Sequence, residues 1–457
     1  PQQFLSPDFR GFAWNSREGL DWRIRYVLDF CEKNDIWVEI NNWETWMKRW
    51  LDQKPDEKGI VSYEEYLAKA QEFGENVAAF LYYLKTRANQ GKGYACVKYY
   101  GLWNEPGGLF PDQDFIHGDY PGYMNLLHKT VYDHLVFYDQ EMGTKVLQGL
   151  QCMGFESYPT FRNRPKAGHP TETWNDMIGR GVLQYLEKPD GLPGEITNWP
   201  GADPYIDIIS VHDYWSVFDY DKNNPSGENQ GTIQDRLIPL MIQGVMDQIV
   251  QYDTDGRIEP LFINEIGGKV YCQGEDHPAQ YCHMLYIVEC LVRGLERGLK
   301  GGSVWAWNMH TGYAAVSYPG CWWEVEPKGV VHPIHENYFP YTLLTRTVKR
   351  GSNMIFTEVQ GGQDDSRGPE TWPVVKTQRV WSTALVTPDN KLAVIVISDS
   401  YNTKEMQIQI APRKGTVEKY FVTSTQCDQL YTNTLDSTDG IIRDQLLPRS
   451  ITVYQVN

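Results

Sequence analysis

Two hydrophobic patterns alternate along the first three quarters of the chain. In residues 20–31 the apolar side chains Ile24, Val27, Leu28 and Cys31 keep the i, i+3, i+4, i+7 spacing of an amphipathic helix. A short, nearly continuous apolar run at 36–40 follows directly and predicts a strand. The same patterns predict further helices at 62–84, 123–142, 233–252, 279–297 and 338–350, and further strands at 97–105, 145–150, 206–215, 260–265 and 302–307.

This alternation indicates an α/β fold. Nearly continuous apolar strands that alternate with helices are typical of parallel strands covered by helices, and this many repeats favours a closed (β/α)8 TIM barrel. Six strands are clear, and residues 12–15 are a candidate for one more. The remaining strand has no counterpart, so either the N-terminus is truncated or the barrel closes irregularly. We predict that this barrel domain spans residues 1–352.

The pattern changes after Gly351. Apolar residues now recur at every second position, in the segments 392–398, 406–410, 418–423 and 451–456, and turn signals such as Asp439-Gly440 separate them. No helical period interrupts these segments. We therefore predict a C-terminal antiparallel β-sandwich over residues 353–457, with 351–372 as the connector.

Charge and hydropathy exclude two classes of partner. The chain has 42 basic and 59 acidic residues and a formal net charge of -17, which repels nucleic acid and anionic lipid surfaces. Its longest apolar runs, such as 392–397, are far shorter than the roughly 20 residues that a membrane helix needs. We expect no nucleic-acid partner and no membrane insertion, and the sequence indicates no oligomeric state.

The sequence contains no recognisable motif for binding a cofactor or a metal. The eight cysteines are scattered, and only Cys272 and Cys282 bracket a short polar loop, where either a surface disulfide or two thiols would fit. The glycine-rich nucleotide motifs, the HExxH zinc motif and the GxSxG nucleophile motif are missing from the sequence. We therefore expect neither a cofactor nor a metal.

Two predicted strands end in the same dipeptide. The strand from Val97 ends in Asn104-Glu105, directly before a proline and two glycines that stop a strand, and the run from Pro260 ends in Asn264-Glu265. In a parallel barrel the functional side chains collect at the carboxyl ends of the strands. Two carboxylates at such ends are what a two-carboxylate glycosidase requires, one to protonate the leaving oxygen and one to attack or to activate water.

These motifs resemble a known group of enzymes. Asn104-Glu105-Pro106, then His212-Asp213-Tyr214 two strands later, Glu265 on the next strand and a tryptophan on the last strand look like the retaining glycoside hydrolases of clan A. The barrel followed by a sandwich further resembles clan families such as 5, 30, 39, 51 and 79. The motifs do not single out one family.

The resemblance implies a role for each of these residues. Glu105 would be the general acid/base and Glu265 the nucleophile, and Asn104 would bind the sugar 2-hydroxyl unless it only caps its turn. Tyr214 would hold Glu265. His212 would touch the substrate or the acid pair, unless it is a satisfied core histidine.

Aromatic residues supply the candidate sugar platforms. The chain has 16 Trp and 29 Tyr, and a flat apolar ring with a polar edge suits a pyranose. By the resemblance Trp305 is the stacking floor, although Trp307 lies on the same predicted face. Asn42 and Trp43, after the strand at 36–40, are further substrate-binding candidates. Of the rival carboxylates, Asp213 lies beside the tip residues and Glu39 lies within its strand, where we expect a buried ion pair.

These observations lead to one functional hypothesis. We expect a retaining β-glycoside hydrolase that cleaves an oligo- or polysaccharide by double displacement, outside the cytoplasm, in an extracellular or periplasmic compartment. A carbohydrate-binding barrel without turnover and a transglycosylase that uses the same pocket are the alternatives. Sequence alone does not distinguish exo from endo action.

Overall fold

The computed structural model describes a large part of the chain. The described residues are 22–41, 63–102, 120–157, 165–166, 169–173, 201, 203–216, 246, 249–250, 253, 255–269, 279–304, 323–325, 331–333, 335–364 and 377–456. The predicted strand at 12–15, most of the predicted helix at 233–252 and the Cys272–Cys282 loop lie outside them.

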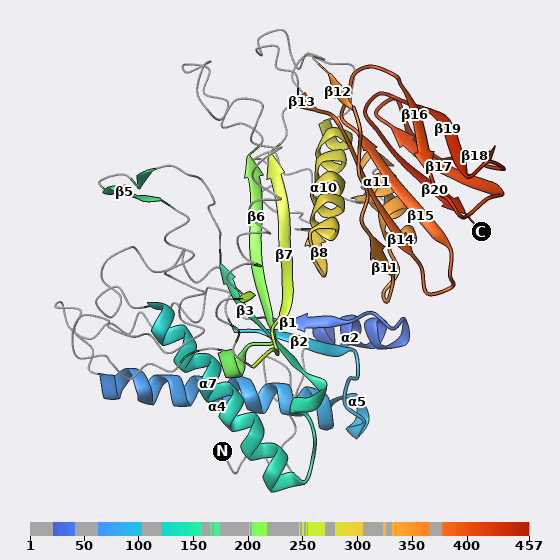
Figure 1. The fold of residues 1–457 in the computed structure, drawn as a ribbon. Coiled ribbons are helices and arrows are strands. Elements are labelled where there is room, and N and C mark those ends of the chain that lie inside the picture. Colours follow the sequence, from blue (N-terminus) through green and yellow to red (C-terminus); the bar gives the residue numbers. More distant parts are fainter. Residues whose placement is uncertain are drawn as a thin grey trace. The chain divides into compact units, whose positions relative to one another are not determined.

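A six-stranded sheet forms the α/β part of the described chain (Figure 1). Its strand order is β1-β2-β3-β6-β7-β8, and the pairs β1–β2, β2–β3 and β3–β6 are parallel. Five of these strands match predicted segments. The bounds are β1 Val38–Ile40, β2 Val97–Gly101, β3 Gln151–Ser157, β6 Ile208–Ser216, β7 Glu259–Lys269 and β8 Gly301–Val304.

The predicted strand at 145–150 is wrong. Leu147–Gly149 forms a 3-10 turn, η2, and β3 begins only at Gln151. The reason is the carboxylate of Asp139, which accepts hydrogen bonds from the backbone N–H of Val146 at 2.8 Å and of Leu147 at 3.0 Å. These bonds hold the segment in a turn, so its apolar residues cannot extend into the sheet.

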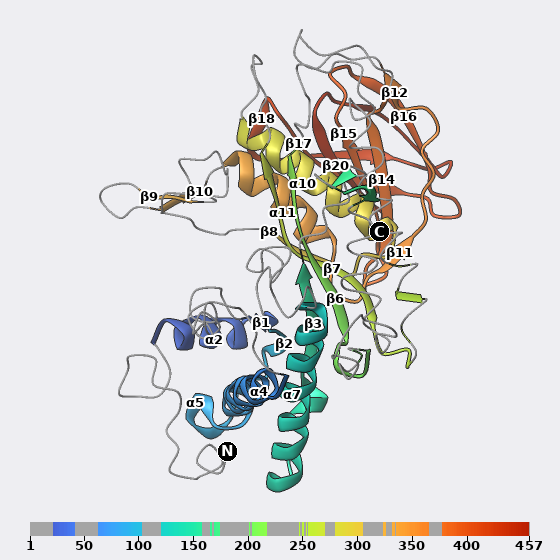
Figure 2. The same ribbon diagram turned by 90° about the vertical axis from the view of Figure 1, so that its left-hand side faces the viewer.

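Amphipathic helices pack on this sheet as predicted (Figure 2). Gly74 lies in the helix contact, where an added Cβ would be 2.6 Å from the Cβ of Thr130, so α4 and α7 approach more closely there than any larger residue permits. The short α5 follows α4 directly, and two of its residues, Asn89 and Gln90, have left-handed φ and ψ. The bounds are α2 Trp22–Lys33, α4 Tyr63–Thr86, α5 Ala88–Gly91 and α7 Tyr120–Met142.

Curvature distinguishes this sheet from a flat one. Strands β2 and β7 are three steps apart in the strand order, which in a flat sheet is roughly 14 Å at about 4.8 Å per step. The rings of Tyr99 on β2 and Phe262 on β7 nevertheless have centroids 6.0 Å apart. The strands therefore bend round a concave face, as in part of a barrel, and the described residues provide six of the eight strands that a complete barrel needs.

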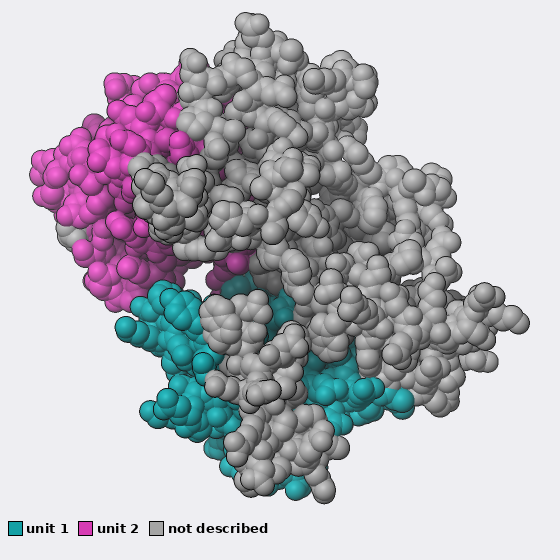
Figure 3. All heavy atoms as spheres, turned by 180° about the vertical axis from the view of Figure 1, so that it is seen from behind, with its two compact units in different colours: residues 1–212, 245–262 teal, residues 213–244, 263–457 magenta. Residues whose placement is uncertain are grey.

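The chain divides into two compact units (Figure 3). Unit 1 comprises residues 1–212 and 245–262, and unit 2 comprises residues 213–244 and 263–457. The limits fall within β6 and β7, so each of these strands continues from one unit into the other. The predicted division at 352/353 stays a prediction.

Unit 2 contains an antiparallel sandwich. Its larger sheet has the order β11-β14-β15-β20-β17-β18, and the antiparallel pair β16–β19 forms a second layer. A buried cluster that includes Val394, Ile442 and Tyr454 fills the space between them. The bounds are β11 Asn353–Ile355, β14 Val380–Val386, β15 Leu392–Ser398, β16 Lys404–Gln409, β17 Thr416–Thr423, β18 Gln426–Asp436, β19 Ile441–Leu446 and β20 Ser450–Val456.

Two helices of unit 2 lie against this sandwich. Helix α10 (Ala279–Glu296) contacts β8, β11, β14 and β15, and α11 (His335–Thr347) contacts β17, β18 and β20. Strand β11 pairs with β14, so the predicted connector already contributes a strand to the sandwich. The remaining short strands form three pairs of their own: β4 (Pro165–Lys166) with β5 (His169–Thr173), β9 (Trp323–Val325) with β10 (Val331–Pro333), and β12 (Gln363–Asp364) with β13 (Thr377–Gln378).

Candidate active site

The carboxyl edge of the parallel sheet is the candidate site. Because β1, β2, β3 and β6 are parallel, their carboxyl ends point the same way; the last residues of these strands are Ile40, Gly101, Ser157 and Ser216. The arrows of β6 and β7 also point the same way (Figure 1). The topology therefore directs the chain segments that follow these strands to a common edge, as expected from the sequence.

Six predicted site residues lie just beyond described strands. Trp305 directly follows the last residue of β8, and Glu105 follows the last residue of β2 by four positions. These residues lie outside the described part of the chain, so their roles stay predictions: Asn42, Trp43, Asn104, Glu105, Trp305 and Trp307.

The other predicted site residues lie in described strands. His212 and Tyr214 are backbone members of β6, and Glu265 is a member of β7. Strand β7 continues past Glu265 through two glycines to Lys269, so the glycines do not end the strand at the dipeptide as the sequence suggested. The strand assignment of all three residues agrees with the sequence analysis, and their roles stay predictions.

Polar groups at the opposite edge fix the start of β2. The Glu32 carboxylate accepts hydrogen bonds from the backbone N–H of Cys96 at 2.6 Å and of Ala95 at 3.2 Å. The Lys85 ammonium donates to the carbonyl of Val97 at 2.9 Å, and burial, followed by the nearby Lys98, lowers the pKa of Lys85. These contacts stabilise the entry of the chain into the strand that leads to Glu105.

A buried polar pair lies between the sheet and α7. His128 of α7 is 1% exposed, and its Nδ1 is 3.2 Å from the Sγ of Cys152 on β3. Burial lowers the pKa of His128 to about 3, so the imidazole is neutral at physiological pH. Burial also raises the pKa of Tyr100, which neighbours Cys152. The sequence analysis missed this pair because no local pattern connects a helical histidine to a cysteine on another strand.

Carboxylates gather before β6 and β7, at the edge away from the candidate site. Asp203, Asp253 and Asp255 present oxygens within 4.8 Å of one another. Backbone N–H groups of Gly256 and Arg257 donate to Asp253 and Asp255, each at 2.9 Å, which is the pattern of a turn. Burial, together with the other two carboxylates, raises the pKa of Asp253. This cluster alone does not indicate a metal site.

The ion pair predicted for Glu39 has no counterpart among the described residues and stays a prediction. Among the described residues Glu39 has no cationic partner, and its Oε1 is buried without a hydrogen-bond donor. Glu39 is in register with Tyr99 of β2, and Tyr99 contacts Phe262 across the curved face. The half-buried side chain therefore lies on the concave side of the sheet.

One sequence expectation concerned membranes. Within the described part of the chain, every helix is too short or too polar to cross a lipid bilayer.

Comparisons with known proteins bear on the fold. No protein-family model matches the chain, and no curated protein sequence matches it. Among solved structures, the family 51 arabinofuranosidase from Xanthomonas axonopodis pv. citri is 12% identical, with a TM-score of 0.54 over 96% of this chain and 79% of that one. A family 51 α-L-arabinofuranosidase from Bifidobacterium longum is 10% identical, with a TM-score of 0.51 over 95% of this chain and 79% of that one.

The chain resembles clan A glycoside hydrolases in fold. A family 30 xylanase from Talaromyces cellulolyticus also matches, at 12% identity, over 86% of this chain and 67% of that one, with a TM-score of 0.48. The half-barrel of parallel strands and the separate antiparallel sandwich agree with this architecture. The resemblance predicted from the Asn-Glu motifs is confirmed at the level of the fold, and no single family is resolved.

Proposed function

We propose that the chain is a retaining glycoside hydrolase that cleaves β-glycosidic or stereochemically equivalent bonds in an oligo- or polysaccharide. One observation supports this proposal: in a fold that resembles clan A glycoside hydrolases, β2 precedes the Asn104-Glu105 dipeptide and β7 contains the Asn264-Glu265 dipeptide. The likeness to solved structures supports the fold. The proposed hydrolysis rests on the two glutamates Glu105 and Glu265.

Glu105 and Glu265 divide the chemistry between them. In the first step Glu265, ionised, attacks the anomeric carbon while Glu105, protonated, gives its proton to the departing oxygen. In the second step Glu105 takes a proton from water, which hydrolyses the glycosyl–enzyme ester. A retaining reaction requires the two carboxyl groups to be roughly 5–5.5 Å apart.

Neighbouring residues complete the proposed site. Tyr214 would donate a hydrogen bond to the nucleophile, and Asn104 would bind the sugar 2-hydroxyl. Trp305 would stack on the sugar face, with Trp307, Asn42, Trp43 and His212 as further contacts. A neutral glycan suits a chain of net charge -17.

The test is hydrolysis of nitrophenyl glycosides. The panel contains the β-glucoside, β-galactoside, β-xyloside, β-mannoside and β-glucuronide, and also the α-L-arabinofuranoside because two of the three solved structures above are arabinofuranosidases. Glu265→Ala should abolish turnover, and azide should then yield the glycosyl azide of inverted configuration. Glu105→Ala should lose roughly 10²–10⁴-fold on poor leaving groups, and azide should yield the retained product.

Glu39→Gln is the matched control, because this carboxylate lies on the concave face, inside β1, and has no role in the proposed chemistry. It should keep wild-type turnover. Loss in Glu39→Gln with none in Glu265→Ala would refute the assignment. Binding of glycans without hydrolysis would favour the carbohydrate-binding barrel, and transfer to an added sugar acceptor in preference to water would favour the transglycosylase.

The location follows from the substrate class. We propose that the protein acts in an extracellular or periplasmic compartment, where polysaccharide is encountered. Fractionation of cells that produce the natural protein tests this, and recovery in the cytoplasm alone would contradict it.

A further inference from the structure

Helix α10 is attached to the sandwich at both of its ends. At its start, the Tyr281 hydroxyl is completely buried and lies 2.9 Å from the carbonyl of Arg449 and 3.1 Å from that of Val422. The two carbonyls belong to the segment before β20 and to β17, which are strands of the large sheet. One hydroxyl proton serves both acceptors, so the contact fixes the helix start against the sheet.

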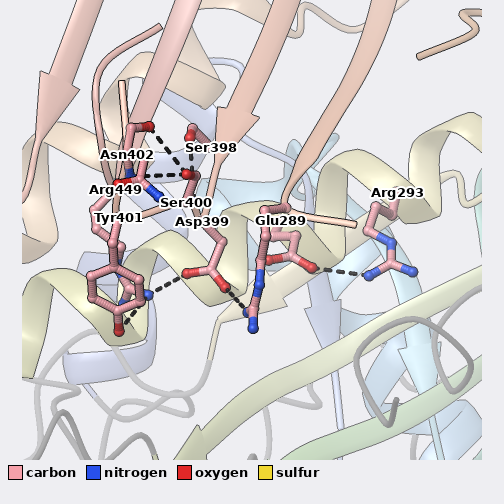
Figure 4. Close-up of polar contacts among 9 residues, drawn as sticks. Glu289, Arg293, Ser398, Asp399, Ser400, Tyr401, Asn402 and Arg449 are labelled. Atoms are coloured by element: carbon pink, nitrogen blue, oxygen red, sulfur yellow. Dashed lines mark hydrogen bonds and ion pairs between the residues drawn. The ribbon is translucent and has the colours of Figure 1, made fainter. Parts of the chain in front are cut away.

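The Arg449 carbonyl is itself held in place. Arg449 has φ +46, a left-handed conformation that is uncommon for a residue other than glycine. Its guanidinium donates to the Asp399 carboxylate, to which Arg379 also donates at 2.9 Å, and it lies 5.1 Å from the centroid of the Tyr401 ring (Figure 4). These buried contacts maintain the backbone conformation that presents the carbonyl to Tyr281.

The far end of α10 contacts the same sheet through a cation. Arg293 donates to Glu289 one turn earlier at 2.9 Å (Figure 4). Its guanidinium lies 5.0 Å from the centroid of the Trp381 ring on β14. The side chains of Arg293 and Glu289 are 7% and 2% exposed, so water screens this pair little. The twelve positions from Tyr281 to Arg293 correspond to about 18 Å of helix, so the two contacts hold α10 against the sandwich at two well-separated points.

The other face of α10 contacts the sheet that carries the proposed nucleophile. Gly302 of β8 has no side chain, and a Cβ there would lie 2.4 Å from Cδ2 of Leu291 and 3.5 Å from the carbonyl of Ile263 on β7. Leu291 therefore packs directly on the backbone of β8, next to β7. Residues of the sandwich and of β8, the neighbour of β7 in the sheet, thus contact the same helix within unit 2.

We propose that Arg293 is a positioning residue, through which the sandwich sets α10 and thereby the β7–β8 pair that carries Glu265 and leads to Trp305. The sandwich is then part of the scaffold of the active site and not an appended module. The catalytic consequence rests on the function proposed above, whereas the structural coupling does not.

The test is hydrogen exchange of the full-length protein, followed by mass spectrometry of peptides from β7 and β8. Arg293→Met keeps an unbranched side chain but removes the charge from Glu289 and Trp381. It should accelerate amide exchange in 259–269 and 301–304 by roughly tenfold or more. Arg293→Lys, which keeps the charge, should restore most of the protection. Trp381→Phe is a milder variant that should change the same peptides less.

Lys419→Met is the matched control. Lys419 and Asp444 form an equally buried ion pair, with side chains 8% and 13% exposed, between β17 and β19 of the same sandwich. This variant should accelerate exchange in 416–436 and 441–446 and leave β7 and β8 unchanged. Equal effects of Arg293→Met and Lys419→Met on β7 and β8, or no effect of either, would overturn the proposal.

Kinetics separate this proposal from the functional one. On whichever glycoside the wild type hydrolyses, Arg293→Met should lower kcat by about tenfold, Arg293→Lys should recover it, and Lys419→Met should leave kcat and KM unchanged. A wild-type protein without turnover would count against the proposed function alone, because the exchange experiment decides the coupling without any substrate.

Discussion

Replacement of Gly74 by alanine should destabilise the contact between α4 and α7. An added Cβ would lie 2.6 Å from Cβ and Oγ1 of Thr130 and 2.7 Å from its backbone carbon, whereas carbon atoms in contact are roughly 3.5–4.0 Å apart. The helices must therefore separate by about 1 Å. Overpacking of this kind costs about 1–3 kcal/mol, and the higher helix propensity of alanine returns about 0.5–1 kcal/mol. Because one neighbour is backbone, which cannot rotate away, we expect a net loss of about 2 kcal/mol.

Native-state hydrogen exchange measures this loss where it occurs. A loss of about 2 kcal/mol corresponds to roughly 30-fold faster exchange of the protected amides in α4 and α7. Gly149→Ala is the control in the same unit, because its Cβ would meet only the end of the Lys85 side chain at 3.7 Å, an ordinary contact. Exchange in Gly74→Ala as slow as in the wild type would refute the packing argument.

Three further predictions follow from buried groups. Burial lowers the pKa of His128 to about 3 in the folded protein, against 6.5 in the unfolded chain, so below pH 6.5 the unfolded state binds more protons and the folded state loses stability. Between pH 7 and pH 5 the free energy of unfolding should fall by about 2 kcal/mol. His128→Gln should remove this loss, measured as a flatter dependence of the urea midpoint on pH. A brief iodoacetamide pulse at pH 8 should label half-exposed Cys427 before Cys96, which is buried and has a pKa raised to about 12 by burial and then by Glu32; equal labelling by peptide mass spectrometry would contradict this. A protein cut after residue 352 should lose cooperative unfolding, because Tyr281 and Arg293 lose their sandwich partners; a sharp calorimetric transition of that fragment would show otherwise.

Helices and sandwich strands were predictable because their signal is local. The apolar spacing of 62–84 sets one face of α4 toward the sheet, and the run 392–398 is buried along its whole length as β15. The strand predicted at 145–150 was wrong for a local reason too, namely hydrogen bonds to a nearby side chain. Periodicity registers apolar residues but not the Asp139 carboxylate that accepts from Val146 and Leu147 and turns the chain.

The candidate site was predictable only as a set of chain positions. The order of the strands that carry His212 and Glu265, and their adjacency in the sheet, agree with the sequence analysis. The attachment of α10 to the sandwich was not foreseen, since Tyr281 and Arg449 are far apart in sequence and a buried hydroxyl–carbonyl bond leaves no local pattern.

The interleaving of the two units in the chain has a consequence for biosynthesis. Residues 213–244, which belong to unit 2, leave the ribosome before residues 245–262, which complete unit 1. At roughly 5–20 residues per second, the first unit waits several seconds for its last strand segment while part of the second is already exposed. Unit 1 therefore receives its last segment only after part of unit 2 has been synthesised, and most of unit 2 follows later. For the same reason, a single genetic crossover cannot exchange one unit as a cassette, and their sequences must change together.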